Sequence, residues 1–271
     1  MKVVILAGGF GTRLAEETEL KPKPMVEVGG RPMLWHIMKH FAHYGCNEFY
    51  LALGYKSEVV KRYFLDYARL VGDLRVDLGT GEVGTGNREC EDWVVNLIDT
   101  GSGTLTGGRV KRLQEQLGDE PFFLTYGDGV SDVNLNHLAE LHRAQGRLVT
   151  VTAVRPPARF GSLVFDGDLV TAFTEKPQTG EGWINGGFLV CEPGIFNYIA
   201  GDESSLEADT LEALAADKQL AAYRHDGFWQ CMDTRRDMLL LEGLWQSGEA
   251  PWCTWDSVNA IATAPMAGWS D

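Results

Sequence analysis

A glycine-rich run close to the N-terminus is flanked by two cationic side chains. Residues 7–14 read AGGFGTRL and residues 21–25 read KPKPM. Glycines let the main chain approach an anion closely and leave backbone N–H groups directed at it. Arg13 and Lys23 add fixed positive charge on either side of this loop. The combination predicts a phosphate-binding loop, and it is more specific than a strand and turn that contain glycines by chance.

Two familiar phosphate-binding fingerprints do not describe this loop. The dinucleotide-binding pattern GxGxxG would need a glycine where Leu14 stands. A Walker A loop needs the sequence GK[ST], which occurs nowhere in the chain. The sequence therefore disfavours both an NAD-linked dehydrogenase and a P-loop nucleotide hydrolase.

Two aspartates are candidates for holding a hard cation. Asp128 follows the apolar run 121–125, PFFLT, and has a glycine on each side, so a metal ion and a phosphate can come close. Asp233, in MDTRRD, follows a short apolar run and precedes a helical pattern. An aspartate at that position is equally suited to cap the helix. From its own residue type and spacing, Asp233 is more simply a helix cap than a metal ligand.

Three histidines recur at helical spacing and superficially resemble a zinc-binding face. They are His36, His40 and His43. The metalloprotease motif requires a glutamate directly after the first histidine, and none is present. We therefore expect these residues to form a half-exposed helix face.

Short apolar runs alternate with amphipathic segments along the first half of the chain. Lys2–Ala7 is rich in β-branched residues and ends at a glycine pair, which is typical of a buried strand that leads into a loop. Residues 32–43 have helical spacing, with Leu34, Ile37, Met38 and Phe41 facing inward. The alternation predicts an α/β fold of three layers, with helices on both faces of a mostly parallel mixed sheet. Further strands are expected at 48–53, 93–99, 121–125 and 148–154, and helices at 57–67, with Ser57 as N-cap, and 135–145.

The second half of the chain has a different pattern and predicts β-rich and helical additions. A hairpin is expected from 162–165 and 169–174, and residues 79–92 are expected to form a long loop. We predict one domain over residues 1–256 and a weakly patterned C-terminal tail over 257–271. Further strands are expected at 187–190, 219–223 and 228–232, and helices at 195–199, 206–216 and 235–246.

The charge balance and the cysteine pattern limit the partners and the compartment. With 24 Lys+Arg against 38 Asp+Glu, the formal net charge is −14, which disfavours binding to nucleic acid or to a membrane surface. The 5 cysteines include no CxxC pair, which is typical of reduced thiols and not of a disulfide framework or a structural zinc. No stretch approaches the roughly 20 apolar residues of a membrane span. The sequence predicts a cytoplasmic protein.

The glycine-rich run and the KPKPM segment together resemble the signature of the sugar-phosphate nucleotidylyltransferases. Other segments resemble the members of that family that transfer a cytidylyl group to glucose 1-phosphate. They are spread from residue 1 to about residue 256 and read MVEVGGRPMLWHIMKH, DTGSGTLTGGRVKRL, FLTYGDGVSDVN, RFG, FTEKP, INGGFLV, GFWQCMDTRRD and LEGLW. The resemblance implies a Rossmann-like nucleotidyltransferase fold and a reaction in which CTP and glucose 1-phosphate give CDP-glucose and pyrophosphate.

The resemblance also implies a set of site residues, a cofactor and an assembly. Catalysis is assigned to Arg13, Lys23 and Asp128, and Mg²⁺ to Asp128 together with Asp233. A homo-oligomer is expected, with a hexamer as the candidate assembly, in nucleotide-sugar biosynthesis for the lipopolysaccharide O-antigen. The implied sugar-phosphate contacts are Glu175, Lys176, Asn185 and Gly186. The implied nucleotide contacts are Leu6, Ala7, Gly8, Gly9, Gly11, Thr12, Arg13, Lys23, Thr104, Arg109 and Asp128.

Several of these assignments have plainer alternatives. Thr104 and Arg109 lie in the run TGSGTLTGGR, which is also compatible with a flexible surface loop, and the EKP around Lys176 is also compatible with a solvated turn. The glutamine that reads the base in related uridylyl- and thymidylyltransferases is missing here, which favours CTP. Transfer of a uridylyl or thymidylyl group, and a non-catalytic module that binds sugar nucleotides, remain the alternative functions.

Overall fold

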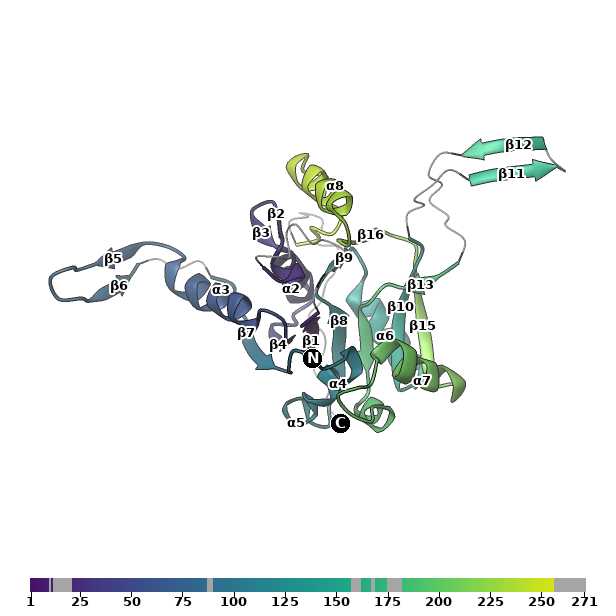
Figure 1. Cartoon of the computed structure of the whole chain (residues 1–271), viewed down its shortest axis with the longest axis horizontal. Coiled ribbons are helices and arrows are strands. Elements are labelled where there is room, and N and C mark those ends of the chain that lie inside the picture. Colours follow the sequence, from purple (N-terminus) through teal and green to yellow (C-terminus); the bar gives the residue numbers. More distant parts are fainter. Residues whose placement is uncertain are drawn as a thin grey trace.

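The structure is a computed structural model of the chain, and it describes residues 1–9, 11, 21–86, 90–156, 162–166, 169–174 and 182–255. Its centre is an eight-stranded sheet within these ranges (Figure 1). The strands lie in the order β13 (Ile184–Asn185), β10 (Val149–Val154), β14 (Leu189–Cys191), β8 (Phe122–Tyr126), β1 (Lys2–Ala7), β4 (Glu48–Leu53) and β7 (Val94–Asp99), while β15 (Leu220–His225) pairs with β10.

Pairing in this sheet is mostly parallel, as the alternating sequence pattern predicts. β8, β1, β4 and β7 are parallel neighbours, and β15 is parallel to β10, whereas β14 and β13 are antiparallel to theirs. In β1, Val3 and Ile5 belong to one buried core and Val4 and Leu6 to the other. Because successive side chains point to opposite faces, this strand is covered on both sides and needs the continuous apolar run that it has. The predicted three-layer α/β fold is confirmed.

Helices cover both faces of the sheet. α2 (Met33–His43) belongs to the first core, while residues of α4 (Thr106–Lys111) and of the π-helix η4 (Leu206–Leu211) belong to the second. The remaining helices are α3 (Ser57–Leu70), α5 (Gln114–Leu117), α6 (Leu135–Gln145), α7 (Glu212–Ala216) and α8 (Arg235–Gln246), with short 3₁₀ turns η2 (Lys23–Met25) and η3 (Pro193–Tyr198). None of the helices in the described ranges has the length and apolar character that crossing a bilayer requires.

Parallel strands bring the ends of two distant segments together. Leu6 of β1 is in register with Tyr126 of β8, and the Gly127 N–H donates to the Leu6 carbonyl at 3.0 Å. The glycines that follow β1 and the aspartate that follows β8 therefore lie at the same edge of the sheet. Since β1 and β8 are neighbours, this arrangement follows directly from the sheet order.

A short ribbon outside the main sheet brings the last segment of the site to this edge. β9 (Gly129–Ser131) pairs antiparallel with β16 (Trp229–Cys231), and Gly129 lies opposite Cys231. The Met232 N–H donates to the Asp128 carbonyl at 2.8 Å, so the chain on either side of the ribbon stays close together. The sequence pattern indicates β16 but gives no signal for β9, which has only three residues.

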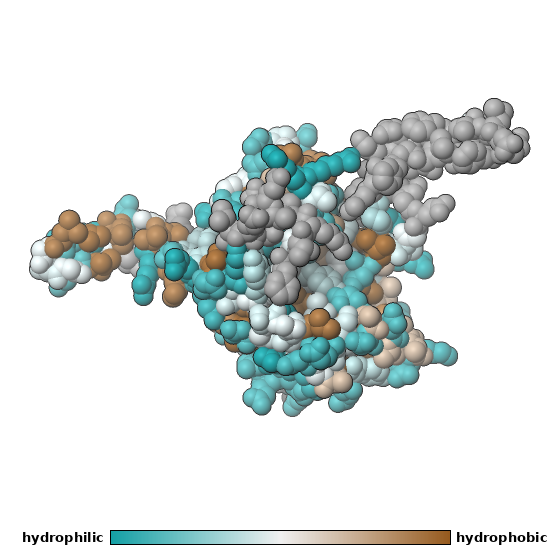
Figure 2. Space-filling view, viewed as in Figure 1, coloured by the Kyte–Doolittle hydropathy of each residue, from teal (hydrophilic) through white to brown (hydrophobic). Residues whose placement is uncertain are grey.

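Three two-stranded hairpins complete the described part of the chain. They are β2 (Glu27–Val28) with β3 (Arg31–Pro32), β5 (Leu74–Val76) with β6 (Val83–Thr85), and β11 (Ser162–Asp166) with β12 (Leu169–Thr174). The last two project from opposite ends of the molecule (Figure 1). Figure 2 shows apolar residues along the β5–β6 hairpin, where Leu74, Val76, Leu78 and Val83 are exposed.

The hairpin at 162–174 is confirmed, but the long loop predicted at 79–92 is wrong. β6 lies inside that range and pairs with β5. The turn between them is organised by Asp77, whose side chain accepts hydrogen bonds from the N–H groups of Gly79 and Thr80. β5 and β6 have three residues each, which is too few for a periodic pattern to be recognised here. The glycines around them therefore indicated a loop.

Other element boundaries agree closely with the sequence pattern. Two further predictions, of a helix cap and of an exposed helix face, need correction. Helix α3 begins at Ser57 but its N-cap is Lys56, in a left-handed conformation with φ 52°, so the predicted Ser57 cap is wrong. His36 and His40 are buried at 0% and 2% exposure, whereas a half-exposed face was expected. The aromatic residues Trp245 and Trp252 cover His36 from the C-terminal part of the chain, which no local pattern reveals. The tail 257–271 lies outside the described residues.

Candidate active site

The loop after β1 forms one wall of a cavity at the edge of the sheet. The segment before and within α4 and the residues that follow β8 and β16 also line this cavity. The residues that line it are Leu6, Ala7, Gly8, Gly9, Gly11, Lys23, Pro24, Ser102, Gly103, Thr104, Leu105, Thr106, Arg109, Tyr126, Gly127, Asp128 and Asp233. Every described residue to which the sequence assigned a nucleotide contact is among them.

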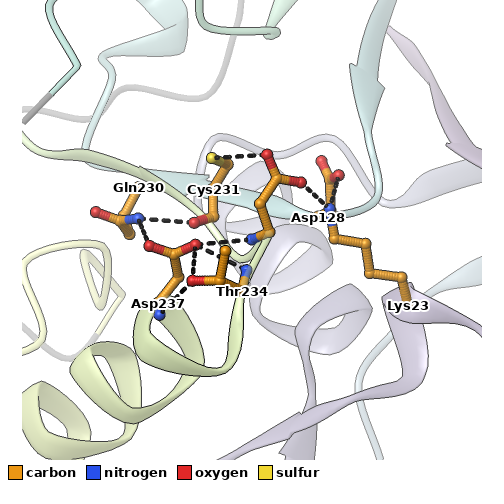
Figure 3. A network of polar contacts seen from close by, with 7 residues as sticks. Lys23, Asp128, Gln230, Cys231, Thr234 and Asp237 are labelled. Atoms are coloured by element: carbon orange, nitrogen blue, oxygen red, sulfur yellow. Dashed lines mark hydrogen bonds and ion pairs between the residues drawn. The ribbon is translucent and has the colours of Figure 1, made fainter. Parts of the chain in front are cut away.

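Lys23 lies between two carboxylates that come from distant parts of the chain. Its ammonium contacts Asp128 Oδ2 at 2.7 Å and forms a second short ion pair with Asp233 Oδ1. Burial by itself would lower the pKa of Lys23, but the charges and hydrogen bonds of the two aspartates outweigh it and hold this pKa above its ordinary value. Figure 3 shows Lys23 pointing at Asp128 beside the turn that follows β16.

The KPKPM segment holds this lysine in place. Pro22 caps the 3₁₀ turn η2 at its N-terminus, and Pro24 is its second residue. Pro24 is buried against Gly127, where an added Cβ would lie 2.9 Å from the proline ring and 3.0 Å from the Leu6 carbonyl. Proline restricts φ and thereby limits the conformations open to the turn. Glycine at 127 is required because three chain segments meet there.

Asp233 is not the cap of the helix that follows it. Thr234 occupies the N-cap of α8 and accepts from the Asp237 N–H, while Asp237 accepts from the Thr234 N–H, so the two residues form a capping box. Asp237 also accepts from the Asp233 N–H at 3.1 Å (Figure 3). The cap interpretation of Asp233 is therefore wrong, and its side chain is directed at Lys23 instead.

The two aspartates fit a small, hard cation. Their oxygens converge on one point, which the Lys23 ammonium approaches, and carboxylate oxygens are the donors that Mg²⁺ prefers. Within the described ranges, no group of three or more His, Cys, Asp and Glu side chains surrounds such a point. Two carboxylate ligands from the protein suit Mg²⁺, because this ion completes its coordination with water and substrate phosphates.

Arg109 is part of the cavity wall, and both terminal nitrogens of its guanidinium donate to protein acceptors. It donates to the carbonyls of Gly8, Leu53, Gly101 and Ser102 at 2.8–3.4 Å and to the Thr100 hydroxyl at 2.7 Å. It is 4% exposed, and burial lowers its pKa. A Cβ added at Gly8 would lie 2.3 Å from it, and one at Gly54 2.4 Å. Arg109 thus ties the loop after β1 to the ends of β4 and β7.

The glycines of the TGG segment pack a helix against another part of the chain. A Cβ at Gly107 would lie 2.8 Å from the Ser204 carbonyl, and one at Gly108 2.6 Å from the Asp202 backbone. The Gly108 N–H donates to the Ser204 carbonyl at 3.1 Å. Glycine is therefore required here for close contact between two backbone segments.

A hydrogen-bond network that the sequence did not indicate lies beside the cavity. Glu207 accepts from the hydroxyls of Tyr126 at 2.7 Å, Thr106 at 2.7 Å and Ser205 at 3.0 Å. Burial and the nearby Glu207 carboxylate raise the pKa of Tyr126, so its hydroxyl keeps its proton. Glu207 is 81 positions away from Tyr126, and no local motif marks either residue as a partner of the other.

The predicted sugar-phosphate contacts are only partly within the described residues. Asn185 donates from Nδ2 to the Tyr126 hydroxyl at 3.1 Å, and the Gly186 carbonyl accepts from Trp229 Nε1 at 2.7 Å. Asn185 therefore lies next to a residue of the cavity, Tyr126. Thr12, Arg13, Glu175 and Lys176 lie outside the described residues.

Comparison with known proteins agrees with this geometry. Residues 2–271 match the family model described as nucleotidyl transferase. The chain is 46% identical over 257 residues to a glucose-1-phosphate cytidylyltransferase of Salmonella typhi, with 94% of this chain and 100% of the relative covered. It is 44% identical over 256 residues to a probable glucose-1-phosphate cytidylyltransferase of Bacillus subtilis (strain 168), again with 94% and 100% covered.

The fold is also shared with a solved structure. HddC from Yersinia pseudotuberculosis, complexed with GMP-PN, superposes with a TM-score of 0.66 at 24% identity, and the match covers 90% of this chain and 99% of that one. At this identity the likeness concerns the fold alone. Taken with the family model and the two relatives, the sheet order and the cavity identify the chain as a member of the nucleotidyl transferase family, similar over nearly its whole length to glucose-1-phosphate cytidylyltransferases.

Proposed function

We propose that this protein transfers the cytidylyl group of CTP to glucose 1-phosphate and releases pyrophosphate and CDP-glucose. The observation that carries the proposal is the convergence of Asp128 and Asp233 on Lys23, beside a glycine-rich loop at the carboxyl end of β1. Both relatives with this activity in their names align along almost their whole length. Lys23, Asp128 and Asp233, three of the residues that the proposal uses, line this cavity.

The reaction is a displacement at the α-phosphorus of the nucleotide. A phosphate oxygen of glucose 1-phosphate forms the new bond to that phosphorus, the bond to the β-phosphate oxygen breaks, and pyrophosphate takes the electron pair. A phosphate monoester has a second pKa near ~6, so the nucleophile is already largely dianionic at neutral pH. No strong general base is needed, and catalysis depends on alignment of two polyanions and on neutralisation of their charge.

Charge neutralisation falls to a small number of side chains. Enzymes of this family generally use a divalent metal, and Mg²⁺ held by Asp128 and Asp233 would polarise the phosphates and stabilise charge on the departing group. Lys23 stands where it can move from the two carboxylates to a phosphate oxygen. Arg13 is proposed to act in the same way on the nucleotide, and Glu175, Lys176 and the Asn185–Gly186 pair on the sugar phosphate.

Arg109 has a different part in this proposal. Because its donors are engaged by backbone carbonyls and one hydroxyl, it shapes the loop that receives the nucleotide. Thr104, which is 8% exposed and lines the cavity next to this loop, is proposed to contact the nucleotide itself. The choice of CTP, the use of Mg²⁺ and a homo-oligomeric assembly are parts of the same proposal.

The proposal is tested by an assay of pyrophosphate release. Purified protein is incubated with glucose 1-phosphate, Mg²⁺ and each of CTP, UTP, dTTP, GTP and ATP, and kcat/KM is compared. CTP should be preferred over UTP by roughly 30-fold to a few ten-thousand-fold, because uracil presents the opposite hydrogen-bond polarity and two mismatched bonds cost about 1–3 kcal/mol each. A UTP or dTTP value equal to that of CTP would assign the protein to the alternative transfer reactions. No pyrophosphate with any nucleotide would favour a non-catalytic module.

A further inference from the structure

The carboxylate of Glu207 joins the two sides of the cavity. Its Oε1 accepts from the Tyr126 hydroxyl and its Oε2 from the Thr106 hydroxyl, each at 2.7 Å. Tyr126 ends β8, two residues before Asp128, and Thr106 begins α4. Both Tyr126 and Thr106 line the cavity, whereas Glu207 is not among its lining residues. Glu207 therefore acts on the cavity through other side chains.

Every hydrogen bond of this network has a defined direction. An ionised carboxylate can only accept, so Tyr126 and Thr106 must both donate to Glu207. With its proton engaged, the Tyr126 oxygen accepts from Asn185 Nδ2 at 3.1 Å. The Asn185 Oδ1 in turn accepts from the Gly187 N–H at 2.9 Å, which fixes the orientation of the amide. The position of Asn185 thus depends, through Tyr126, on the carboxylate.

The backbone that carries Glu207 is itself fastened to α4. The Leu105 N–H donates to the Asp202 carbonyl at 2.9 Å, and the Leu206 N–H to the Thr106 hydroxyl at 2.9 Å. Arg112 makes two hydrogen bonds to the Asp202 carboxylate at 2.8 and 2.6 Å. Glu207 lies in a π-helical turn, a geometry that often occurs at functional sites. The carboxylate therefore extends from a backbone fastened to α4 to Tyr126 at the end of β8.

We infer that Glu207 is a positioning residue, which holds Tyr126 and Asn185 in register with the loop 102–106 so that the two substrates are aligned for transfer. This inference rests on the proposed function, because it assigns the sugar phosphate to the side of Asn185 and the nucleotide to the side of Thr106. It requires no contact between Glu207 and either substrate. Its signature is a loss of turnover without a matching loss of affinity for the nucleotide alone.

Three variants test the inference. Glu207→Ala should lower kcat by roughly 10- to 100-fold, since small misplacements of reacting groups have effects of this size. The Kd for CTP, measured calorimetrically without sugar phosphate, should remain close to that of the unaltered protein. Glu207→Gln keeps the length of the side chain and one acceptor, so it should recover part of the lost turnover. Glu212→Gln, which alters an exposed carboxylate on α7, is the matched control and should leave kcat unchanged.

A double variant separates positioning from general structural support. Tyr126→Phe removes the hydroxyl that links Glu207 to Asn185, so its effect on kcat should not add to that of Glu207→Gln. The inference is overturned if kcat of Glu207→Ala, per folded molecule, stays within about twofold of the unaltered value. It is also overturned if CTP affinity falls as much as kcat, or if the Tyr126 and Glu207 effects are fully additive.

A failure of the Glu207 inference can be distinguished from a failure of the proposed function. Turnover of the unaltered protein is first measured with the whole nucleotide panel, and the variants are then compared with whichever nucleotide is used. If that nucleotide is not CTP, the proposed function fails while the Glu207 inference is still tested with the same pair of substrates. A normal kcat in Glu207→Ala with CTP as the preferred nucleotide would overturn only the inference.

Discussion

Lys23 and Arg109 line the same cavity, but the protein holds them in opposite ways. Lys23 contacts two carboxylates, Asp128 and Asp233, and these hold its pKa above the ordinary value. Arg109 donates to neutral carbonyls and a hydroxyl, and burial lowers its pKa. The partners of Lys23 are charged groups that a metal ion could take over. Four of the five partners of Arg109 are backbone carbonyls, which no substrate can replace.

This difference separates the electrostatic part of the cavity from its scaffold. On the Lys23 side, the ammonium and the two carboxylates contact one another through side chains alone. These side chains can therefore change partners when a cation and phosphates bind, without any movement of the backbone. On the Arg109 side, the guanidinium holds the Gly8 carbonyl at the end of β1, and glycine is required at positions 8 and 54 to admit it. Substitutions on the first side should act on turnover, and those on the second on stability.

The largest expected effect is on turnover, at the carboxylate side. Asp128→Asn keeps the shape of the side chain but removes the charge that pairs with Lys23 and would hold the metal ion. We expect kcat to fall roughly 100- to 1,000-fold at saturating Mg²⁺, as measured by pyrophosphate release. Asp119→Asn, at an exposed position, serves as the control. Near-normal turnover at limiting Mg²⁺ would remove Asp128 from the metal site.

The corresponding change on the scaffold side should reduce stability. Arg109→Lys cannot reproduce the five hydrogen bonds and leaves buried carbonyls without donors. The free energy of unfolding should fall by about 2–4 kcal/mol, as measured by urea denaturation. Arg147→Lys, at an exposed position, is the matched control. A stability equal to that of the unaltered protein would contradict the scaffold role.

Two neighbouring glycines offer a sharper test of the same idea. Gly8→Ala would place a Cβ 2.3 Å from the Arg109 guanidinium, whereas among the described residues beyond its chain neighbours no atom lies within 4 Å of a Cβ at Gly9. The first variant should lose about 1–3 kcal/mol of stability through overpacking. Gly9→Ala should unfold at the normal urea concentration but raise the KM for CTP, because Gly9 lines the cavity. Equal destabilisation by both substitutions would show that Arg109 is not the cause.

The smallest expected effect concerns the competition between Lys23 and a metal ion. In Lys23→Met the ammonium no longer neutralises the two aspartates, so Mn²⁺ should bind about threefold or more tightly in the absence of nucleotide. Titration calorimetry measures this affinity directly. Lys21→Met, which removes the ion-pair partner of Glu27, is the control and should leave the affinity unchanged. Weaker binding in Lys23→Met would indicate that lysine and metal ion do not share these carboxylates.

Local sequence patterns determined much of the fold and one half of the site. The strand Lys2–Ala7 and the helices Leu135–Gln145 and Arg235–Gln246 have the predicted bounds, because each has an apolar period long enough to identify it. The glycines after β1 and Lys23 were predicted from their own spacing, and both line the cavity. Asp128 was predicted because it directly follows a recognisable buried strand.

The roles of Asp233, Arg109 and Glu207 became clear only from the tertiary structure. Asp233 is paired with Lys23, which lies 210 positions away in the sequence. The helix cap for which the sequence made Asp233 a candidate is formed by the neighbouring Thr234. The structural role of Arg109 follows from its hydrogen bonds to distant carbonyls, such as that of Gly8. The role of Glu207 follows from the hydroxyls of Thr106 and Tyr126, which belong to other elements. Periodicity and motifs describe residues that are close along the chain. A hydrogen bond between distant residues depends on how the sheet order and the helix packing bring their backbones together, and no local pattern encodes this.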